Sequence, residues 1–526
     1  MHNEPLEIKP RRVLLFFAVL ALGTALMSYA VILALAAGSI SLILLSGTGS
    51  FNIQILLLGL FGVCVGGALL WSAVPRPEKF EAPGIPLERS SQPRLFEELE
   101  GIARNLGEEL PESTYLIGDA NAYVADVGGW MGFRSRRIMA LGLPLVSGLT
   151  VSEFRAVLAH EFAHYYGGDT SLGPWVFKAR MAMIRAFQNV QTLGGLARIN
   201  LLAMLYLVVV TILKWNFKLF MRVTNFVSRK QEYRADELAC LIAGVESLTG
   251  GLQKIRALNA SWKPYWETEI LPIVEAGRMP YVAEGYARFV AVPRISAQID
   301  TILKKTLVTE KPGAYDTHPP LRDRIRAAGE IKTPALAADT RMASCLFDGI
   351  EQLELAWVQR ELPRLTSKQL PRVPWSDLVP EIIAPAWVRF AKDHAELLAN
   401  ITAAGLPEAA KTLKSMAKGI RNPPGKLLSQ EQRAERAGQL LGVGVGLILL
   451  ARGWELHGAP GELYLSNGAS KINPFVLVGL LVHGQMTKEA WLKQCETWQI
   501  SGVALNSTLG VPIAEHLPST ETQANA

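Results

Sequence analysis

The sequence is poor in cysteine, in histidine and in charge. Its four cysteines are widely separated and form no Cys-x-x-Cys pair, which favours a reducing compartment for the soluble part of the protein. Charged residues make up only 19% of the chain and the mean hydropathy is positive, a combination typical of a protein that lies partly in lipid. The net charge of +6 is not carried by any dense run of lysine and arginine. This argues against nucleic acid as a partner and favours contact with a membrane surface.

Long apolar runs, in contrast, are present near the N-terminus. Residues 13–45 carry no charge and exceed the roughly 7–15 apolar residues of a cleaved signal, so we expect them to be retained. Residues 53–74 form a second uncharged run that is long enough to cross a bilayer. Residues 1–75 are therefore predicted to form a transmembrane hairpin. Basic residues precede the first span and follow the second, which places both ends in the cytoplasm.

The region after the hairpin contains short segments with β character. Residues 93–106 have the pattern of a helix, and β-like stretches follow at residues 113–117 and 137–141. Asn121 and a glycine-rich turn lie between these two stretches. A strand here has two interpretations: a free edge to which an extended peptide adds, or the ordinary edge of a hairpin. The pattern does not separate them.

The clearest chemical signal is the H-E-x-x-H arrangement at residues 160–164. Thr150 and Glu153 form a capping-box signature before it and a Gly-Gly pair follows it, so the segment is predicted to be a helix. At 3.6 residues per turn, His160 and His164 then project from one face, one turn apart. Two imidazoles in this arrangement can hold one metal ion.

Glu161, beside the first histidine, is the natural candidate for the general base that takes a proton from a water molecule at the metal. The alternative is a buried helix with two structural histidines. Because the chain has only eight histidines, a chance match to the four-position pattern is on the order of one in a hundred. The metal site is therefore favoured.

We expect residues 201–223 to form an apolar segment that is embedded in the membrane. Residues 201–213 are uncharged, but a length of 13 residues fits a buried, re-entrant or interfacial segment better than a separate span. Lys214, Lys218 and Arg222 then recur every four residues. They predict a helix that lies on or dips into an anionic leaflet, or else an ordinary solvated helix face.

Glu232 and Asp236 lie four residues apart in a helical pattern and so share one face. One carboxylate can bind the metal while the other supports a ligand histidine from behind. Two histidines and one glutamate leave the fourth position of zinc open for water, as in catalytic zinc sites. By spacing alone this signal is weak, because such pairs are common on solvated helices.

Four motifs occur in one order along the chain. They are Asn-Ala-Tyr at residues 121–123, H-E-x-x-H at 160–164, Ser-Arg-x-x-Glu-Tyr-x-Ala-Asp at 228–236, and Thr-His-Pro-Pro-Leu at 317–321 with Arg324. In this order they resemble the membrane zinc metallopeptidases typified by HtpX and the CAAX prenyl endopeptidase. The resemblance covers about residues 90–330. It does not extend to an HtpX-like four-span topology, because the stretch between the second histidine and Glu232 lacks two clean spans.

The resemblance implies a gluzincin fold with one zinc ion per chain. Its ligands would be His160, His164 and Glu232, and Glu161 would be the catalytic base. Asp236 would support a ligand histidine.

Three further roles are less direct. By the same resemblance, Asn121 and His318 would contact the scissile carbonyl or its oxyanion. His318 has an equally good structural interpretation, as a loop residue before a proline-started helix. Asp169, just past the metal helix, either orients a ligand histidine or caps the turn.

Together these patterns predict a mainly α fold with a small β-sheet. It comprises the transmembrane hairpin, a zincin-like (gluzincin) peptidase domain at residues 76–332, and a mostly helical C-terminal domain of unknown role at residues 333–526. The predicted protein is a zinc endopeptidase of a bacterial inner membrane, with its site in the cytoplasm and peptides or proteins as substrates. A role in membrane protein quality control would fit. The alternative is a catalytically silent, membrane-tethered peptide-binding protein, against which the intact Glu161 argues.

Overall fold

The computed structural model describes most of the chain in two compact units. Unit 1 holds the described residues up to Ala260 together with Asp300–Trp357, and unit 2 holds Ser261–Ile299 together with the described residues from Val358 onward. The described residues are 23, 27, 30, 34, 37–45, 53–74, 80–128, 135–165, 173–193, 200–310, 318–334, 336–365, 370–423 and 427–509.

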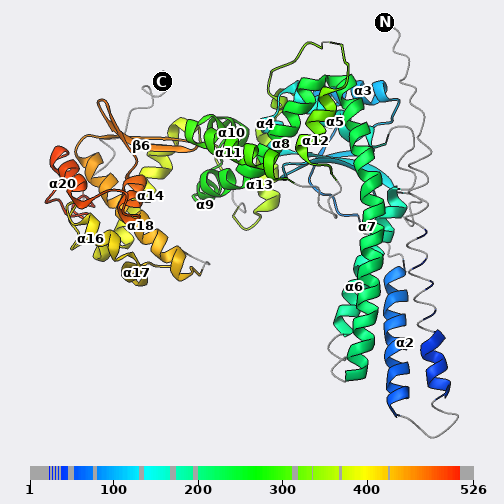
Figure 1. Ribbon diagram of the computed structural model, residues 1–526. Coiled ribbons are helices and arrows are strands. Elements are labelled where there is room, and N and C mark those ends of the chain that lie inside the picture. The colour runs from blue at the N-terminus through cyan, green and yellow to red at the C-terminus, as the bar shows by residue number, and fades with distance from the viewer. Residues whose placement is uncertain are drawn as a thin grey trace. The chain divides into compact units, whose positions relative to one another are not determined.

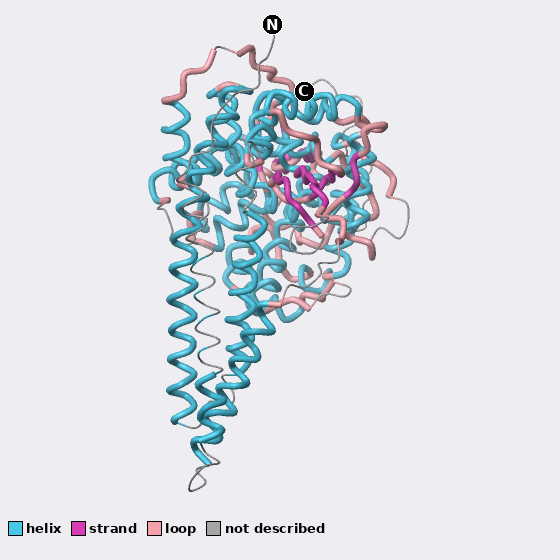
Figure 2. The backbone as a smooth tube through the Cα atoms, turned by 90° about the vertical axis from the view of Figure 1, so that its right-hand side faces the viewer, coloured by secondary structure: helices cyan, strands magenta, loops and turns pink. Residues whose placement is uncertain are grey.

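Three helices of unit 1 lie side by side and extend away from its sheet (Figures 1 and 2). They are α2 (Ile53–Ala73), α6 (Gly173–Leu193) and α7 (Asn200–Ala243). Apolar side chains hold them together: Phe61, Val65 and Leu69 of α2, Ala186 and Val190 of α6, and Val209 and Val210 of α7 form one buried cluster.

Among the described residues, α2 is one of two helices that are long and apolar enough to cross a membrane. It coincides with the second predicted span. Of the first predicted span, residues 13–45, the described part includes residues 37–45, which are helical, and four single positions. The remainder of that span, and the turn that follows it, lie outside the described residues.

The helix α7 is continuous over 44 residues. Its sequence contains no glycine and no proline, so nothing interrupts the backbone hydrogen bonds until Gly244, whose φ of 91° ends it. The stretches 201–213, 214–223 and 228–242, considered separately in the sequence, are therefore parts of one helix. Since α6 runs antiparallel to α7, the chain that leaves the histidine segment returns to it within unit 1 (Figure 1).

Unit 1 contains a four-stranded sheet with strand order β1-β2-β4-β3. Its strands are β1 (Ile85–Leu87), β2 (Ser113–Ile117), β3 (Ala122–Val127) and β4 (Arg136–Gly142). β2 and β4 are parallel, whereas β1 and β3 pair antiparallel with their neighbours. Two of these strands match the predicted stretches closely. The residue pattern did not assign a strand to residues 122–127, whereas the family resemblance implied an edge strand at Asn121; the segment is a strand, β3, at an edge of the sheet.

Helices cover this sheet and build the core of unit 1. The helix α3 (Pro93–Leu106) packs against α5 (Val151–Ala163), and α5 packs in turn against α7. The side chains between them are fully buried, including Leu95, Leu99 and Phe154. Unit 1 also contains α4 (Leu143–Gly148), α12 (Leu321–Gly329) and the 3-10 turn Ala343–Leu346.

Unit 2 is built around the buried helix α18 (Gln430–Ala451). This is the second helix that passes the length and composition test for a span, but its apolar residues lie in the core of unit 2. It is therefore a core helix of unit 2. Around it pack α14 (Ala384–Asp393), α16 (Leu406–Lys411), α17 (Leu413–Met416) and α19 (Pro474–Val482), with α20 (Lys488–Thr497) contributing Trp491 to the same core.

A second small sheet lies in unit 2, where the sequence predicted mostly helix. It consists of β5 (Glu455–Ala459), β6 (Glu462–Asn467) and β7 (Ser470–Ile472) in consecutive antiparallel pairs. The other helices for which the described residues give bounds are α8 (Val245–Tyr265), α9 (Leu271–Glu275), α10 (Val282–Ala291), α11 (Pro293–Thr309), α13 (Ile350–Glu361), α15 (Ala395–Leu398), the 3-10 turns Trp375–Asp377 and Ala417–Gly419, and the π-helical turns Trp266–Ile270 and Val379–Ile383.

Candidate active site

The helix α5 fixes the two histidines by its first turn and its apolar back. Thr150 and Glu153 form a complete capping box: the Glu153 backbone N–H donates to Thr150 Oγ1 at 3.3 Å, and the Thr150 N–H donates to the Glu153 carboxylate at 2.8 Å. Phe154, Leu158 and Phe162 are buried on the opposite face. The capping box fixes where the helix begins, and the buried face fixes its rotation. The directions in which His160 and His164 project are therefore set.

The side chains of His160 and His164 lie beside each other, with ring centroids 4.8 Å apart, and α7 brings Glu232 up to both of them. His160 Nε2 is 3.5 Å from Glu232 Oε2, and His164 Nε2 is 3.5 Å from Glu232 Oε1. One nitrogen or oxygen from each residue lies within 4.8 Å of the others. These three residues are thus a candidate metal group.

The donor set fits a zinc ion in two respects. Ligand atoms about 2.0–2.1 Å from a tetrahedral ion lie about 3.4 Å from one another, close to the two separations of 3.5 Å seen here. Glu232 Oε2 is also buried, and the only groups near it are nitrogens of His318 at 2.9 Å, Arg324 at 3.4 Å and His160 at 3.5 Å among the described residues. A buried carboxylate oxygen in this state is costly unless a cation is bound to it.

Asp236 supports His160 from behind. Its Oδ1 lies 3.0 Å from His160 Nδ1, on the side of the ring opposite Glu232. Arg324 of α12 holds the same carboxylate with two hydrogen bonds, from Nε to Oδ2 at 2.9 Å and from Nη2 to Oδ1 at 2.6 Å. All three side chains are buried. A carboxylate behind a ligand histidine fixes the ring orientation and its tautomer.

His318 and Asn121 lie nearer the surface. The side chain of His318 is 61% exposed while its Nδ1 reaches Glu232, so it sits at the rim of the candidate metal group. Asn121 directly precedes the edge strand β3, which packs against α5. Its side chain is exposed and is not part of the metal group, and its backbone fits closely over Gly142, where a Cβ would lie 2.6 Å from Asn121 O. Asp169 lies outside the described residues.

Comparison with known proteins identifies the domain that carries this group. Residues 89–332 match the family described as Peptidase family M48. This stretch is an M48 metallopeptidase domain. It contains all four motifs noted in the sequence, although Ser261–Ile299 within it packs as part of unit 2.

The M48 domain also aligns with curated proteases. The chain is 28% identical over 249 residues to the protease HtpX of Stutzerimonas stutzeri, covering 45% of this chain and 74% of that protein. It is 27% identical over 300 residues to the protease HtpX of Chromohalobacter salexigens, covering 53% and 86% respectively. These are distant relatives, and no solved structure matches the chain.

The protonation of the M48 site is strongly shaped by its burial. Burial lowers the pKa of His164 to about 4, and the neighbouring His160 adds to the effect, so the ring is neutral at pH 7. Burial also opposes protonation of His160, but hydrogen bonds to Asp236 and Glu232 outweigh it and raise the pKa to about 9. Without a cation, a proton on His160 balances the carboxylates. Zinc binding would release that proton.

Glu161 differs from the other carboxylates of the M48 site. Burial is the main reason that its pKa is raised to about 7, with a further contribution from the negative charge of Glu232. Glu232 itself keeps a pKa far below the usual range, because its hydrogen bonds to His160 and His318 outweigh the effect of burial. The two carboxylates are thus separated in basicity, as expected where one binds a cation and the other exchanges a proton.

The role of Arg324 was not foreseen from the sequence, where it appeared only as part of a motif. A signal was available, however. Leu321, Arg324 and Ala328 are spaced as one face of a helix, and all three are buried in α12. An arginine on such a face requires a buried carboxylate partner, which Asp236 provides.

Proposed function

We propose that this protein is a membrane-anchored endopeptidase that uses one zinc ion to cut protein chains on the cytoplasmic side of a bacterial membrane. The observation that carries the proposal is the group of His160, His164 and Glu232, two of them buried and His164 partly exposed, beside Glu161 within an M48 domain. The apolar helix α2 supports membrane anchoring. The basic residues outside the two apolar runs, with none in the turn between them, support the cytoplasmic orientation.

His160, His164 and Glu232 would hold the zinc ion, and three protein ligands is the number typical of catalytic zinc sites. Bound zinc supplies Lewis acidity, which polarises a peptide carbonyl and lowers the pKa of a water molecule. Asp236 keeps the His160 ring turned so that Nε2 faces Glu232.

Glu161 would move the proton in this reaction. As a carboxylate it accepts a proton from the attacking water, and it then donates that proton to the nitrogen of the leaving amine. A pKa raised toward neutrality suits both steps, because the group must bind and release a proton at the working pH.

The substrate would be held as an extended strand at the edge of the sheet. Among the described strands β3 has a neighbour on one side only, which leaves backbone groups for an added strand, although the Val124 carbonyl already accepts a hydrogen bond from the Tyr165 hydroxyl at 2.9 Å. Asn121 at the start of this strand and the exposed His318 would both donate to the oxygen on which charge develops. The processing of misfolded membrane proteins would be one use of such a site.

The direct test is proteolysis of an unfolded protein such as casein by the full-length chain purified in detergent. We expect cleavage that stops when the metal is removed by 1,10-phenanthroline and returns when zinc is added back, with about one zinc ion bound per chain. Cleavage that persists in metal-free protein would contradict the zinc mechanism. Zinc binding without cleavage, before or after re-addition, would favour the alternative of a silent peptide-binding protein.

Arg324 offers a test of how the site is held. We expect Arg324→Lys to weaken zinc binding by about 10–100-fold, because lysine keeps the charge but cannot grip Asp236 with two parallel hydrogen bonds. Arg322→Lys is the matched control, since Arg322 is exposed on the same helix. Titration with zinc gives the affinity and thermal unfolding of the metal-free protein gives the stability. Equal zinc affinity in the two variants would show that Arg324 has no positioning role.

A further inference from the structure

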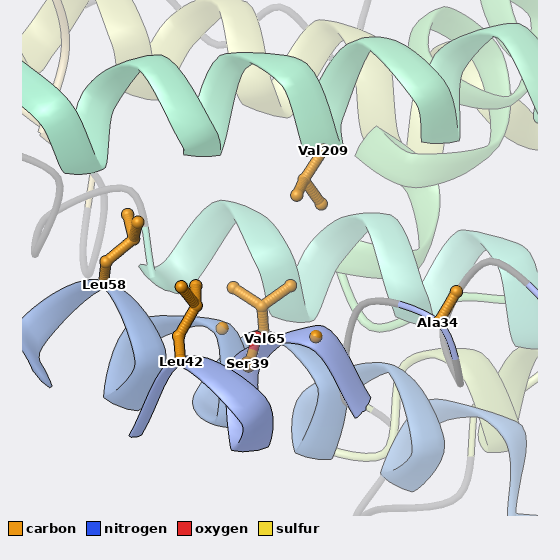
Figure 3. Close-up of a pocket in the computed structure, with 8 residues that line it drawn as sticks. Ala34, Ser39, Leu42, Leu58, Val65 and Val209 are labelled. Atoms are coloured by element: carbon orange, nitrogen blue, oxygen red, sulfur yellow. The ribbon is translucent and has the colours of Figure 1, made fainter. Parts of the chain in front are cut away.

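The exposed surface of the helices α2 and α7 changes from mainly apolar to cationic at one level along the two helices. Val65 of α2 and Val209 of α7 line the same small apolar cavity of about 340 Å³ and lie opposite each other (Figure 3). Both helices run toward the sheet of unit 1 (Figure 1). Six residues beyond each valine stands a tryptophan, Trp71 and Trp215, exposed by 64% and 71%. The two tryptophans are therefore at the same height on the pair.

Below this level the exposed side chains of the two helices are apolar apart from Gln54 and Thr211. On α2 the apolar ones include Leu57, Leu60 and Val63, and on α7 they include Leu207 and Ile212. No charged residue occurs in α2, and none occurs in α7 before Lys214. An apolar surface of this kind on two adjacent helices is unfavourable in water and favourable in lipid.

Cationic side chains appear on the surface at and above this level, next to the exposed Trp215 and Leu219. Lys214, Lys218 and Arg222 all lie on the surface of α7. Arg185 of α6 donates from Nε to the carbonyl oxygen of Ser72 at 3.2 Å, next to the end of α2. Tryptophans followed by lysine and arginine are the pattern found where a helix leaves the hydrocarbon and meets anionic headgroups.

The two tryptophans Trp71 and Trp215 and the cationic residues Lys214, Lys218 and Arg222 form one band around the helices. We propose that this band marks the surface of an anionic leaflet and that α7 is a rigid spacer between the leaflet and the metal group. The proposal rests on the function proposed above. Glu232 lies seventeen positions beyond Trp215 in one uninterrupted helix. At 1.5 Å per residue the catalytic group stands about 25 Å above the band. The lack of glycine and proline in α7 means that no kink shortens this distance.

The spacer defines the class of membrane-bound substrate. An extended chain rises about 3.3 Å per residue, so it needs about eight residues to climb from the bilayer surface to the site. The catalytic group can therefore reach peptide bonds that lie more than about eight residues from the membrane span of the substrate. It cannot reach bonds next to the span or inside the bilayer.

A series of anchored substrates tests this limit. One cleavable, unfolded segment is placed about four, eight, twelve or sixteen residues from a single membrane span and reconstituted with the enzyme in vesicles that contain anionic lipid. We expect the nearest segment to be cut about 10²-fold more slowly than the two farthest, because its bond cannot be brought into register with the catalytic group. Equal rates at all four positions would overturn the spacer. The same tails without a span should all be cut equally, and failure to cut those free tails would count against the proposed function instead.

The position of the leaflet can be measured without activity. Spin labels are attached to cysteines introduced at Leu207 and at Arg222, in a chain where the exposed Cys64 and the half-buried Cys345 are replaced by alanine. We expect the label at position 207 to be relaxed by oxygen dissolved in the hydrocarbon and the label at 222 by a water-soluble nickel chelate. Labels that both lie in water, or both in hydrocarbon, would place the boundary elsewhere and overturn the proposal.

Discussion

Replacement of Glu161 by glutamine is expected to lower the rate of peptide hydrolysis by about 10⁴-fold or more, at the upper end of what general acid–base catalysis contributes. Glutamine has nearly the shape of glutamate, so α5 and its histidines should stay in place. Its amide cannot accept a proton from water at neutral pH or return one to the leaving amine. Zinc content should remain at the wild-type level, because Glu161 is not in the metal group.

The same helix supplies the control for this experiment. Glu153→Gln makes an identical chemical change two turns earlier in α5, where glutamine can still complete the capping box with Thr150. We expect this variant to cut casein at nearly the wild-type rate. Rates are compared at equal zinc content, measured by mass spectrometry on the samples used in the assay. A Glu161→Gln protein that retains substantial activity would exclude Glu161 as the base.

The parts of the site that could be predicted are those set by local rules. The helix α5 was predictable because its capping box and its buried phenylalanines are encoded within 13 residues, and the structure contains both features. The M48 family could likewise be recognised from motifs, and the comparisons confirm it. The mainly helical character of the chain also followed from local patterns.

Other features depend on contacts between distant segments or on weaker signals. The strand β3 has Tyr123, Val124 and Val127, which favour strands, but the segment was not assigned as one from its residue pattern; its pairing along β4 sets its bounds. The sheet of unit 2 was missed although Asn467-Gly468 stands at its second turn, with Gly468 at a φ of 59°. The apolar segments on either side of these turns were interpreted as parts of a helical domain. The length of α7 could have been foreseen, since 44 residues without glycine or proline contain no signal for a break.

The four-residue spacing of Glu232 and Asp236 was a weak signal for a metal site because spacing does not reveal burial. Glu232 and Asp236 share a helix face, as many exposed pairs do, but here both carboxylates are buried. A buried pair of like charges is stable only with cations beside it. Arg324 supplies one charge to Asp236, and a proton on His160 or a zinc ion supplies the other to Glu232. Burial therefore turns a common sequence pair into a specific prediction about metal.

Removal of the Glu232 carboxylate is expected to weaken zinc binding by more than about 100-fold, because the loss of a ligand should cost more than the loss of a supporting residue. We expect Glu232→Ala and Glu232→Gln both to lose zinc and casein cleavage. Alanine removes one of the two carboxylates beside His160 and Arg324, which leaves Asp236 alone to balance them and so also destabilises the metal-free protein. Glutamine keeps the side-chain volume, which makes it the better variant for measuring zinc affinity alone.

Glu237→Gln is the matched control, since Glu237 is exposed on the same helix one residue beyond Asp236. Zinc at about 100 times its dissociation constant should stabilise the wild type and this control by about 2.7 kcal/mol, and it should leave the unfolding of Glu232→Gln unchanged. Zinc stoichiometry and the shift in melting temperature report this without an activity assay. If Glu232→Gln binds zinc as tightly as the control, the third ligand lies elsewhere and the buried carboxylate serves only to balance His160. Loss of binding in Glu232→Gln alone would assign the carboxylate to the metal, because a general effect of altering α7 would weaken both variants.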